Sequence, residues 1–250
     1  MSKTICLALT GASGMPYGLR LLECLLEAGC RVQLIYSQAA QIVARQEMML
    51  DLPSRPAETQ AALRARFGVL PGTLDVYGRE EWFAPVARGS NPPDAMVVCP
   101  CTMGTLAAIA QGLANNLIER AADVALKEGR KLVLVPRETP FSAIHLENML
   151  RLVRAGAVIL PPNPGFYHHP QSVDALVDFV VARILDQLGI AHALMQLDAA
   201  AAGAREEVNS NCERAGIGSE DQANSARHYR PGFARGGAKS SAPPGPRTSL

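Results

Sequence analysis

The chain has 250 residues, of which 48% are hydrophobic, and a formal net charge of +1. This length predicts one domain or two small ones, with a sizeable core. A nearly balanced charge gives the protein no overall positive field that would attract nucleic acid and no negative one that would attract a polycation. Any anion must therefore be bound by a few local cations. No stretch approaches the roughly 20 apolar residues of a membrane span, and no signal peptide is evident. We expect a soluble, cytoplasmic protein.

Short apolar runs alternate with helical patterns along most of the chain. Strands are predicted at 5–9, 31–36, 73–77, 95–100, 131–135 and 157–160. Helices are predicted from Pro16 to just before Gly29 and at 38–49, 57–66, 102–111, 116–128, 142–155 and 173–188. Such alternation specifies a parallel sheet covered on both faces. We therefore predict a Rossmann-like three-layer α/β/α fold with a mainly parallel sheet.

The end of the chain has a different composition. From Asp198 onward alanine, glycine, serine, proline and charged residues dominate, and large apolar residues are few. Such a segment buries too little apolar surface to offset its ordering entropy. We predict one folded domain over residues 1–197 and a disordered tail over 198–250.

The cysteines and histidines do not form a metal motif. Only Cys99 and Cys101 are close in sequence, and a lone pair lacks the second pair that a zinc site needs. Adjacent histidines such as His168 and His169 rarely point the same way in a loop, and His145, within a predicted helix, fits a structural role. We predict free cysteines in the core of a cytosolic protein, and no metal.

Two strand-to-helix loops carry small and hydroxylated residues. Parallel sheets bind ligands beyond the carboxyl ends of their strands, where both loops are predicted. Thr10-Gly11-Ala12-Ser13-Gly14 either holds a flavin or phosphate at a helix start or is a plain tight turn. Pro100 to Thr105 either caps its helix or contacts the same ligand. Two such loops at neighbouring strand ends favour a ligand.

A few Arg and Lys side chains are candidates for binding an anion. Arg137 directly follows a buried strand, a place that favours an anion ligand over a solvated charge. Arg120 and Lys127 share a helix face with Asp123, the usual pattern of an exposed, ion-paired stripe. Arg183 alone would be a snorkelling surface residue.

Two aromatic residues have more than one interpretation. Tyr167 follows a predicted strand and is able to donate to a phosphate. Trp82 follows two glutamates and either packs its ring on a flavin or anchors an irregular loop. The sequence alone leaves this choice open.

Six motifs in order resemble those of the UbiX-like flavin prenyltransferases, flavoproteins of the HFCD-type fold. They lie at 10–14 with Tyr17-Gly18, 99–105, 115–127, 134–140, 145–149 and 164–167. The resemblance covers residues 3 to about 190, nearly all of the predicted folded part, and the ordered set is specific. One departure is Gly104, where many relatives carry Lys or Asn, so a side chain that could contact the flavin is missing.

The resemblance implies a transferase that uses reduced FMN as a substrate and requires no metal. It would join the dimethylallyl group of dimethylallyl phosphate to N5 and then to C6 of the flavin, with release of phosphate. The product, prenylated FMN, is the cofactor of a UbiD-like decarboxylase, which would be the partner. The resemblance also implies a homo-oligomer, a dodecamer, in which several site residues come from different subunits.

The same resemblance assigns the site residues. The flavin-contacting positions are Gly11, Ala12, Ser13, Ser37, Thr102, Met103, Gly104, Thr105 and Arg137. The prenyl-phosphate positions are Arg120, Lys127, Tyr167 and Arg183, and the catalytic positions are Glu47, Lys127, Glu138, Trp82 and Ser13. Glu47 and Glu138 are candidates for moving protons at ring closure. The Trp82 ring could shield an allyl cation.

One feature of the residues agrees independently with this assignment. No two aspartates are adjacent, so the aspartate-rich magnesium motif of most prenyl-transferring enzymes is absent. The charge of the leaving group must then be met by fixed Arg, Lys and Tyr donors and by helix ends.

Two other functions remain as alternatives. An FMN-dependent decarboxylase of cysteine-derived carboxylates should carry an early catalytic His and a Pro-x-Met-Asn motif, yet no His precedes residue 145. A subunit that only stores or delivers flavin would leave Glu138 and Lys127 free to vary. Prenyl transfer is the function that we expect.

Overall fold

The structure is a computed structural model that describes residues 2–194. The predicted tail over 198–250 lies outside the described residues, as do the last residues of the predicted domain. Among residues 2–194 no helix is both long and apolar enough to span a membrane.

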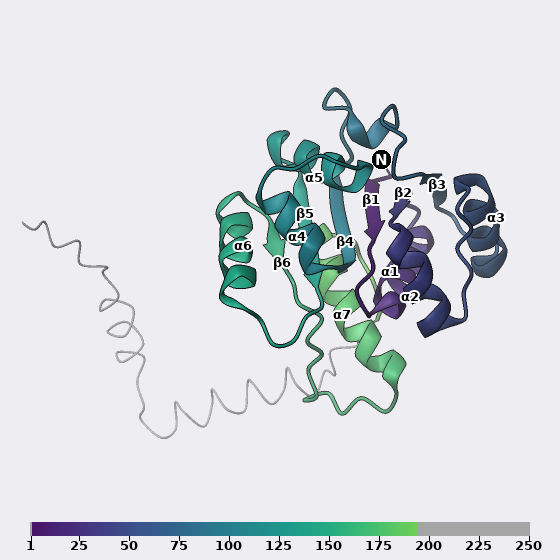
Figure 1. The fold of residues 1–250 in the computed structure, drawn as a ribbon. Helices are drawn as coiled ribbons and strands as arrows, with labels where there is room; N and C mark the ends of the chain where they lie inside the picture. Colours follow the sequence, from purple (N-terminus) through teal and green to yellow (C-terminus); the bar gives the residue numbers. More distant parts are fainter. Residues whose placement is uncertain (1, 195–250) are drawn as a thin grey trace, which may run out of the picture. The chain divides into compact units, whose positions relative to one another are not determined.

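The fold is built on one sheet of six parallel strands, in the order β3-β2-β1-β4-β5-β6 (Figure 1). The strands are β1 (Thr4–Leu9), β2 (Arg31–Tyr36), β3 (Thr73–Tyr77), β4 (Ala95–Cys101), β5 (Lys131–Pro136) and β6 (Val158–Ile159). All neighbours pair in parallel. The chain first builds outward from β1 to β3 and then returns to place β4 on the other side of β1. This reversal is where ligands bind in sheets of this kind.

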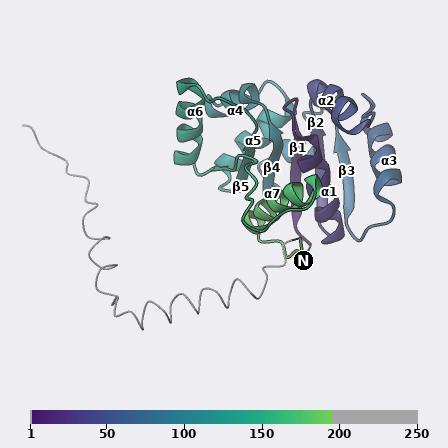
Figure 2. The same cartoon turned by 90° about the horizontal axis from the view of Figure 1, so that it is seen from below.

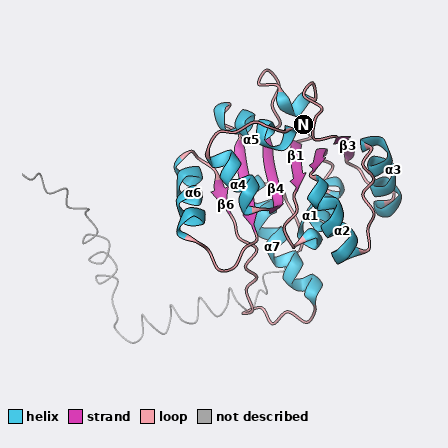
Figure 3. Cartoon of the chain, viewed as in Figure 1, coloured by secondary structure: helices cyan, strands magenta, loops and turns pink. Residues whose placement is uncertain are grey.

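Helices cover both faces of the sheet (Figures 2 and 3). They are α1 (Met15–Glu27), α2 (Gln38–Met48), α3 (Pro56–Phe67), α4 (Met103–Ala110), α5 (Leu117–Lys127), α6 (Ala143–Arg154) and α7 (Val173–Leu188), with a short 3-10 turn, η1 (Pro85–Ala87), before β4. The predicted three-layer fold is confirmed. Each predicted helix and strand is present with ends shifted by at most one or two residues, and η1 is an addition.

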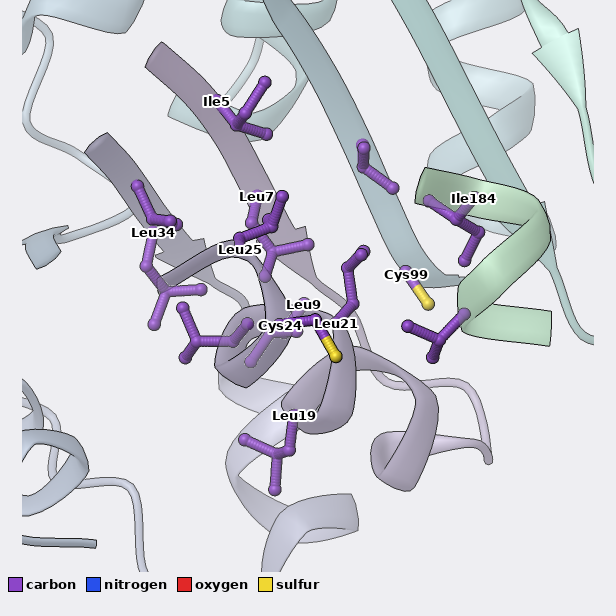
Figure 4. Packing of buried hydrophobic residues seen from close by; sticks show 14 of the residues in the cluster. Ile5, Leu7, Leu9, Leu19, Leu21, Cys24, Leu25, Leu34, Cys99 and Ile184 are labelled. Carbon is purple, nitrogen blue, oxygen red and sulfur yellow. The ribbon is translucent and has the colours of Figure 1, made fainter. Parts of the chain in front are cut away.

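Alternation along the strands divides the core into two clusters. Ile5, Leu7 and Leu9 of β1 are fully buried and lie in the cluster beneath α1 and α7 (Figure 4). Cys6 and Ala8 alternate with these residues along β1, so their side chains point to the other face and belong to the cluster with α4, α5 and α6. Because both faces are covered, central strands such as β1 and β4 are nearly continuous apolar runs. Each large buried side chain contributes roughly 1.5–3 kcal/mol to folding.

The cysteines of the described residues are free and buried. Burial raises the pKa of the Cys6 and Cys101 thiols to about 12, so both are neutral at physiological pH. They act as small core side chains. Within residues 2–194 no group of three His, Cys, Asp or Glu side chains is placed to hold a metal. Cys212 lies outside the described residues.

Gly18 is where α1 crosses closest to the sheet. An added Cβ would lie 2.7 Å from Leu9 Cδ2 and would overlap the Cys99 carbonyl oxygen. We expect Gly18→Ala to lower the free energy of unfolding by about 1–3 kcal/mol, because α1 must shift off the sheet. The control is Gly104→Ala, since a Cβ there meets no atom within 4 Å. Urea unfolding followed by circular dichroism tests this, and equal stability of both variants would contradict the close approach.

Candidate active site

The carboxyl ends of the strands meet at one edge of the sheet, the lower edge in Figure 1. The loop at 10–14 and the loop at 102–105 lie there and are tied together by Thr10, which is 1% exposed. Its hydroxyl donates to the Pro100 carbonyl oxygen at 2.7 Å and accepts from the Thr102 N–H at 2.8 Å. The two predicted loops are therefore held together by Thr10, a residue of the first motif to which the sequence assigned no role.

Ser37 and Thr102 begin helices at this edge. Ser37 Oγ accepts from the Ala40 N–H at 3.1 Å and caps α2. Thr102 Oγ1 accepts from the Thr105 N–H at 3.1 Å and contacts Thr105 Oγ1 at 2.9 Å, which caps α4. The capping interpretation of the second loop is correct. A hydroxyl keeps further hydrogen-bonding capacity, so capping does not prevent a contact with a ligand.

Glu47, from the last turn of α2, closes the start of α1. Its carboxylate accepts from the Gly14 N–H at 3.0 Å and from the Met15 N–H at 2.8 Å. These two amides are thus already bound by a side chain of the same chain, so an anion at this loop would need other donors. No sequence motif marks this contact, since Glu47 lies about 30 residues away from the loop.

The same contacts keep Glu47 ionised. Partial burial raises the pKa of its carboxyl, but hydrogen bonds from the Ser13 side chain and the Gly14 and Met15 N–H groups, with the charge of Arg137, lower it below the ordinary 4.5. Hydrogen bonds to the charged form of a carboxylate have this effect. Glu47 is therefore a fixed negative charge at neutral pH rather than a ready proton donor.

We expect Glu47→Gln to lower the free energy of unfolding by about 0.5–2 kcal/mol at pH 7, the usual range for a lost helix cap. A carboxyl whose pKa is lowered by folding stabilises the protein above its unfolded pKa, and this stabilisation is lost as the pH falls through the folded pKa. The difference between wild type and variant should therefore shrink below about pH 4.5. Thermal unfolding of both proteins from pH 3 to pH 8 measures it; a difference independent of pH would contradict the cap.

Arg137 and Glu138 follow β5 at the same edge. The Arg137 N–H donates to the Cys101 carbonyl at 3.3 Å, and its Nε donates to the Ser13 carbonyl at 3.3 Å. Arg137 therefore joins β5 to both loops while its guanidinium stays largely exposed. Glu138 is half-buried, and its Oε1 accepts from the Thr139 N–H at 3.1 Å. One protomer thus brings the flavin positions and both candidate glutamates to a single edge.

Lys127 lies at a different edge of the sheet. Lys127 is the last residue of α5, and β5 begins shortly after it at Lys131, which pairs with Ala95 at the start of β4. Lys127 is therefore at the amino edge of the sheet, about 20 Å from Arg137 along a six-residue strand. One protomer does not bring Lys127 to the carboxyl edge. Arg120 is near the start of α5, where the Leu117 N–H donates to the Arg79 carbonyl at 2.8 Å, just after β3.

Both cations carry acidic neighbours. Arg120 Nη1 pairs with Asp123 at 2.8 Å, and Lys127 Nζ pairs with Glu128. The predicted ion-paired stripe is thus present for Arg120 and Asp123.

Trp82 precedes η1, in the segment that packs on α5, and is 45% exposed.

Tyr167 lies in the loop between β6 and α7, and Arg183 lies on α7. Tyr167 is 76% exposed, with its ring centroid 6.0 Å from that of Phe179, and Arg183 pairs with Asp186 at 2.8 Å. His168 stacks on Phe179 at 5.2 Å, a packing role that the sequence analysis missed. A single protomer therefore separates Lys127 from the predicted flavin positions at the carboxyl edge.

Relatives of known function match most of this chain. The flavoprotein family model matches residues 1–185. A flavin prenyltransferase UbiX from Pseudomonas aeruginosa is 61% identical over 186 residues, which cover 74% of this chain and 89% of the relative. A flavin prenyltransferase UbiX from Alkalihalophilus pseudofirmus is 47% identical over 194 residues, covering 78% and 95%.

Solved structures agree with these relatives. AnUbiX (PadA1), in complex with FMN and dimethylallyl pyrophosphate, is 40% identical with a TM-score of 0.68, covering 76% of this chain and 94% of that one. A dodecameric FMN-dependent UbiX-like decarboxylase from Escherichia coli O157:H7 is 42% identical with a TM-score of 0.68, covering 77% and 98%. Fold and family model together define a flavoprotein. The chain belongs to the UbiX family of flavin prenyltransferases, which are transferases.

Proposed function

We propose that this chain joins the dimethylallyl group of dimethylallyl phosphate to N5 and C6 of reduced FMN, without a metal, and releases phosphate. The prenylated FMN would serve as the cofactor of a UbiD-like decarboxylase in the cytoplasm. The observation that carries the proposal is the 61% identity to a flavin prenyltransferase over 186 residues. The arrangement of the carboxyl edge supports it.

The flavin is assigned to the carboxyl edge. Its contacts there would be Gly11, Ala12, Ser13, Ser37, Thr102, Met103, Gly104, Thr105 and Arg137. Met103 is only 8% exposed, so its contact would come from its backbone. Open space beside Gly104 means that the side chain found in many relatives has no substitute from neighbouring residues. Since Glu47 occupies the Gly14 and Met15 amides, the FMN phosphate is assigned to other donors of this edge.

Prenyl transfer needs a donor site that stabilises a leaving phosphate. In this step the C1–O bond of the donor breaks, and its electron pair leaves with the phosphate oxygen. The N5 lone pair forms the new C–N bond, and the N5 proton ends on the phosphate. Arg120, Lys127, Tyr167 and Arg183 would bind the phosphate, since fixed cationic and hydroxyl donors stabilise charge as it develops. The Trp82 ring would face the developing allyl cation.

Ring closure requires proton movement but no net change in protons. A proton adds to the prenyl double bond, C6 of the flavin bonds to the resulting cation, and C6 then loses its own proton. Glu138, half-buried beside the flavin edge, is the group we assign to this transfer. Glu47 would instead hold the Ser13 loop in place, because its contacts keep it ionised.

The complete site would need several copies of the chain. In one protomer Lys127 lies at the amino edge of the sheet and the proposed flavin positions lie at the carboxyl edge, yet reaction requires reacting groups within a few ångströms. We infer a homo-oligomer, a dodecamer like the UbiX-like protein from Escherichia coli. In it Arg120 and Lys127 of one copy would approach the flavin edge of another.

The test uses the purified full-length chain. It is incubated without oxygen with reduced FMN and dimethylallyl phosphate, and the flavin is analysed by mass spectrometry. A flavin heavier by one five-carbon prenyl unit, with phosphate released in equal amount, is the expected result. Unmodified FMN, bound tightly but with the donor intact, would instead identify a flavin-storage subunit.

A further inference from the structure

Three cationic side chains gather where the segment before β4 packs on α5. Arg120 Nε donates to the Ala87 carbonyl oxygen at 3.2 Å. Lys127 Nζ lies 2.6 Å from the position that a Cβ on Gly89 would take. Ala87 therefore touches Arg120, and Gly89 touches Lys127 together with its partner Glu128; Arg88 lies between Ala87 and Gly89 in the chain. Arg88 is exposed, so a third cation belongs to the same short segment.

The charge of this surface is centred on Arg88. Arg120 pairs with Asp123, and Lys127 pairs with Glu128, so both positive charges are partly compensated. Arg88 Nη2 donates to the Phe83 carbonyl at 2.9 Å, a neutral acceptor, and within residues 2–194 no carboxylate forms an ion pair with Arg88. The exposed guanidinium keeps most of its five N–H donors for a ligand.

Exposed aromatic rings lie beside this charge. Phe83 is 86% exposed and Trp82 is 45% exposed, and both directly precede η1. Large exposed rings near the Arg88 guanidinium suit an amphiphilic ligand with an apolar chain and an anionic head. A short prenyl phosphate or prenyl diphosphate has this form.

We propose that Arg88 is a donor-binding residue that adapts this site to a diphosphate donor, dimethylallyl diphosphate. The inference rests on the proposed function, which assigns Arg120 and Lys127 to the donor phosphate. A second phosphoryl group adds negative charge and oxygen acceptors, and a guanidinium binds such oxygens in a bidentate way. In the reaction the C1–O bond breaks with its electron pair on the diphosphate, N5 bonds to C1, and the N5 proton goes to the diphosphate.

The experiment compares the two donors. Wild type, Arg88→Ala and Arg88→Lys are assayed for kcat/KM with dimethylallyl phosphate and with dimethylallyl diphosphate. We expect wild type to use both donors. Arg88→Ala should lower kcat/KM for the diphosphate about 10- to 100-fold, the range for a hydrogen bond to a charged group, and Arg88→Lys should lose less. The monophosphate value should fall by less than about threefold, as for a weak exposed pair.

Arg66→Ala, on the exposed last turn of α3, is the matched control and should change neither value. An equal fall for both donors in Arg88→Ala, or wild type that uses only the monophosphate, would overturn the inference and leave prenyl transfer intact. If no donor reacts, the proposed function fails. Titration calorimetry then tests Arg88 separately: inorganic pyrophosphate should bind wild type more tightly than Arg88→Ala, and equal affinity would overturn the inference.

Discussion

Mixing two variants that each fail to make the ring-closed product, Lys127→Ala and Glu138→Gln, should restore formation of that product. Each change removes an assigned group and should lower activity about 10²- to 10⁴-fold on its own. Lys127 is at the amino edge and Glu138 at the carboxyl edge, about 20 Å apart in one protomer. In a mixed oligomer about a quarter of the sites would combine two intact surfaces, because partners in symmetric assemblies combine at random.

The matched control is a mixture of Lys127→Ala with Arg120→Ala. Both residues are on α5, so one copy supplies both to a site, and no combination gives an intact surface. This mixture should stay inactive. Native mass spectrometry shows whether subunits have exchanged. Exchanged oligomers of the first pair that stay inactive would show that the site is not shared between copies.

The fold could be predicted almost completely from the sequence. Strands such as β4 (Ala95–Cys101) are continuous apolar runs because helices cover both faces of a parallel sheet. Helix ends are marked by local features, such as the Asn116 cap of α5 and Gly189 after α7. These signals depend on neighbouring residues, which is why the predicted ends agree within one or two residues.

The site was predicted less completely, because it depends on contacts distant in sequence. The Glu47 cap of α1 joins residues about 30 positions apart and follows no motif. The Thr10 link between two loops spans about 90 residues. By contrast, the separation of Lys127 from the loops has a sequence signal, since a residue at the end of a helix that directly precedes a strand lies at the amino edge.

These contacts give the two glutamates different tasks. Glu47 accepts backbone N–H groups of the flavin-side loop and is held ionised, which suits a residue that fixes loop geometry. Glu138 accepts one N–H, that of Thr139, through Oε1. A carboxyl with fewer fixed contacts is the better candidate for gaining and losing a proton during turnover.

Glu138→Gln should therefore stop the reaction after the first bond is formed. The N5–C1 bond forms and phosphate leaves without a proton from Glu138, whereas ring closure needs one delivered to the double bond and one removed from C6. We expect one phosphate released per flavin at nearly the wild-type rate and ring closure slowed about 10²- to 10⁴-fold. Rapid quenching followed by chromatography and NMR measures both, since the open adduct and the closed product have equal mass.

Glu47→Gln is the comparison that separates a proton-transfer role from a loop-positioning role. It keeps the shape of the side chain but loses the charge that holds the Gly14 and Met15 amides. This variant should bind reduced FMN more weakly and slow both steps together, with no accumulation of the open adduct. If Glu138→Gln blocked phosphate release as well, Glu138 would act in the first step or in holding the site. If Glu47→Gln accumulated the open adduct instead, the two assignments would be reversed, and the fixed negative charge at the start of α1 would be the proton-transfer group.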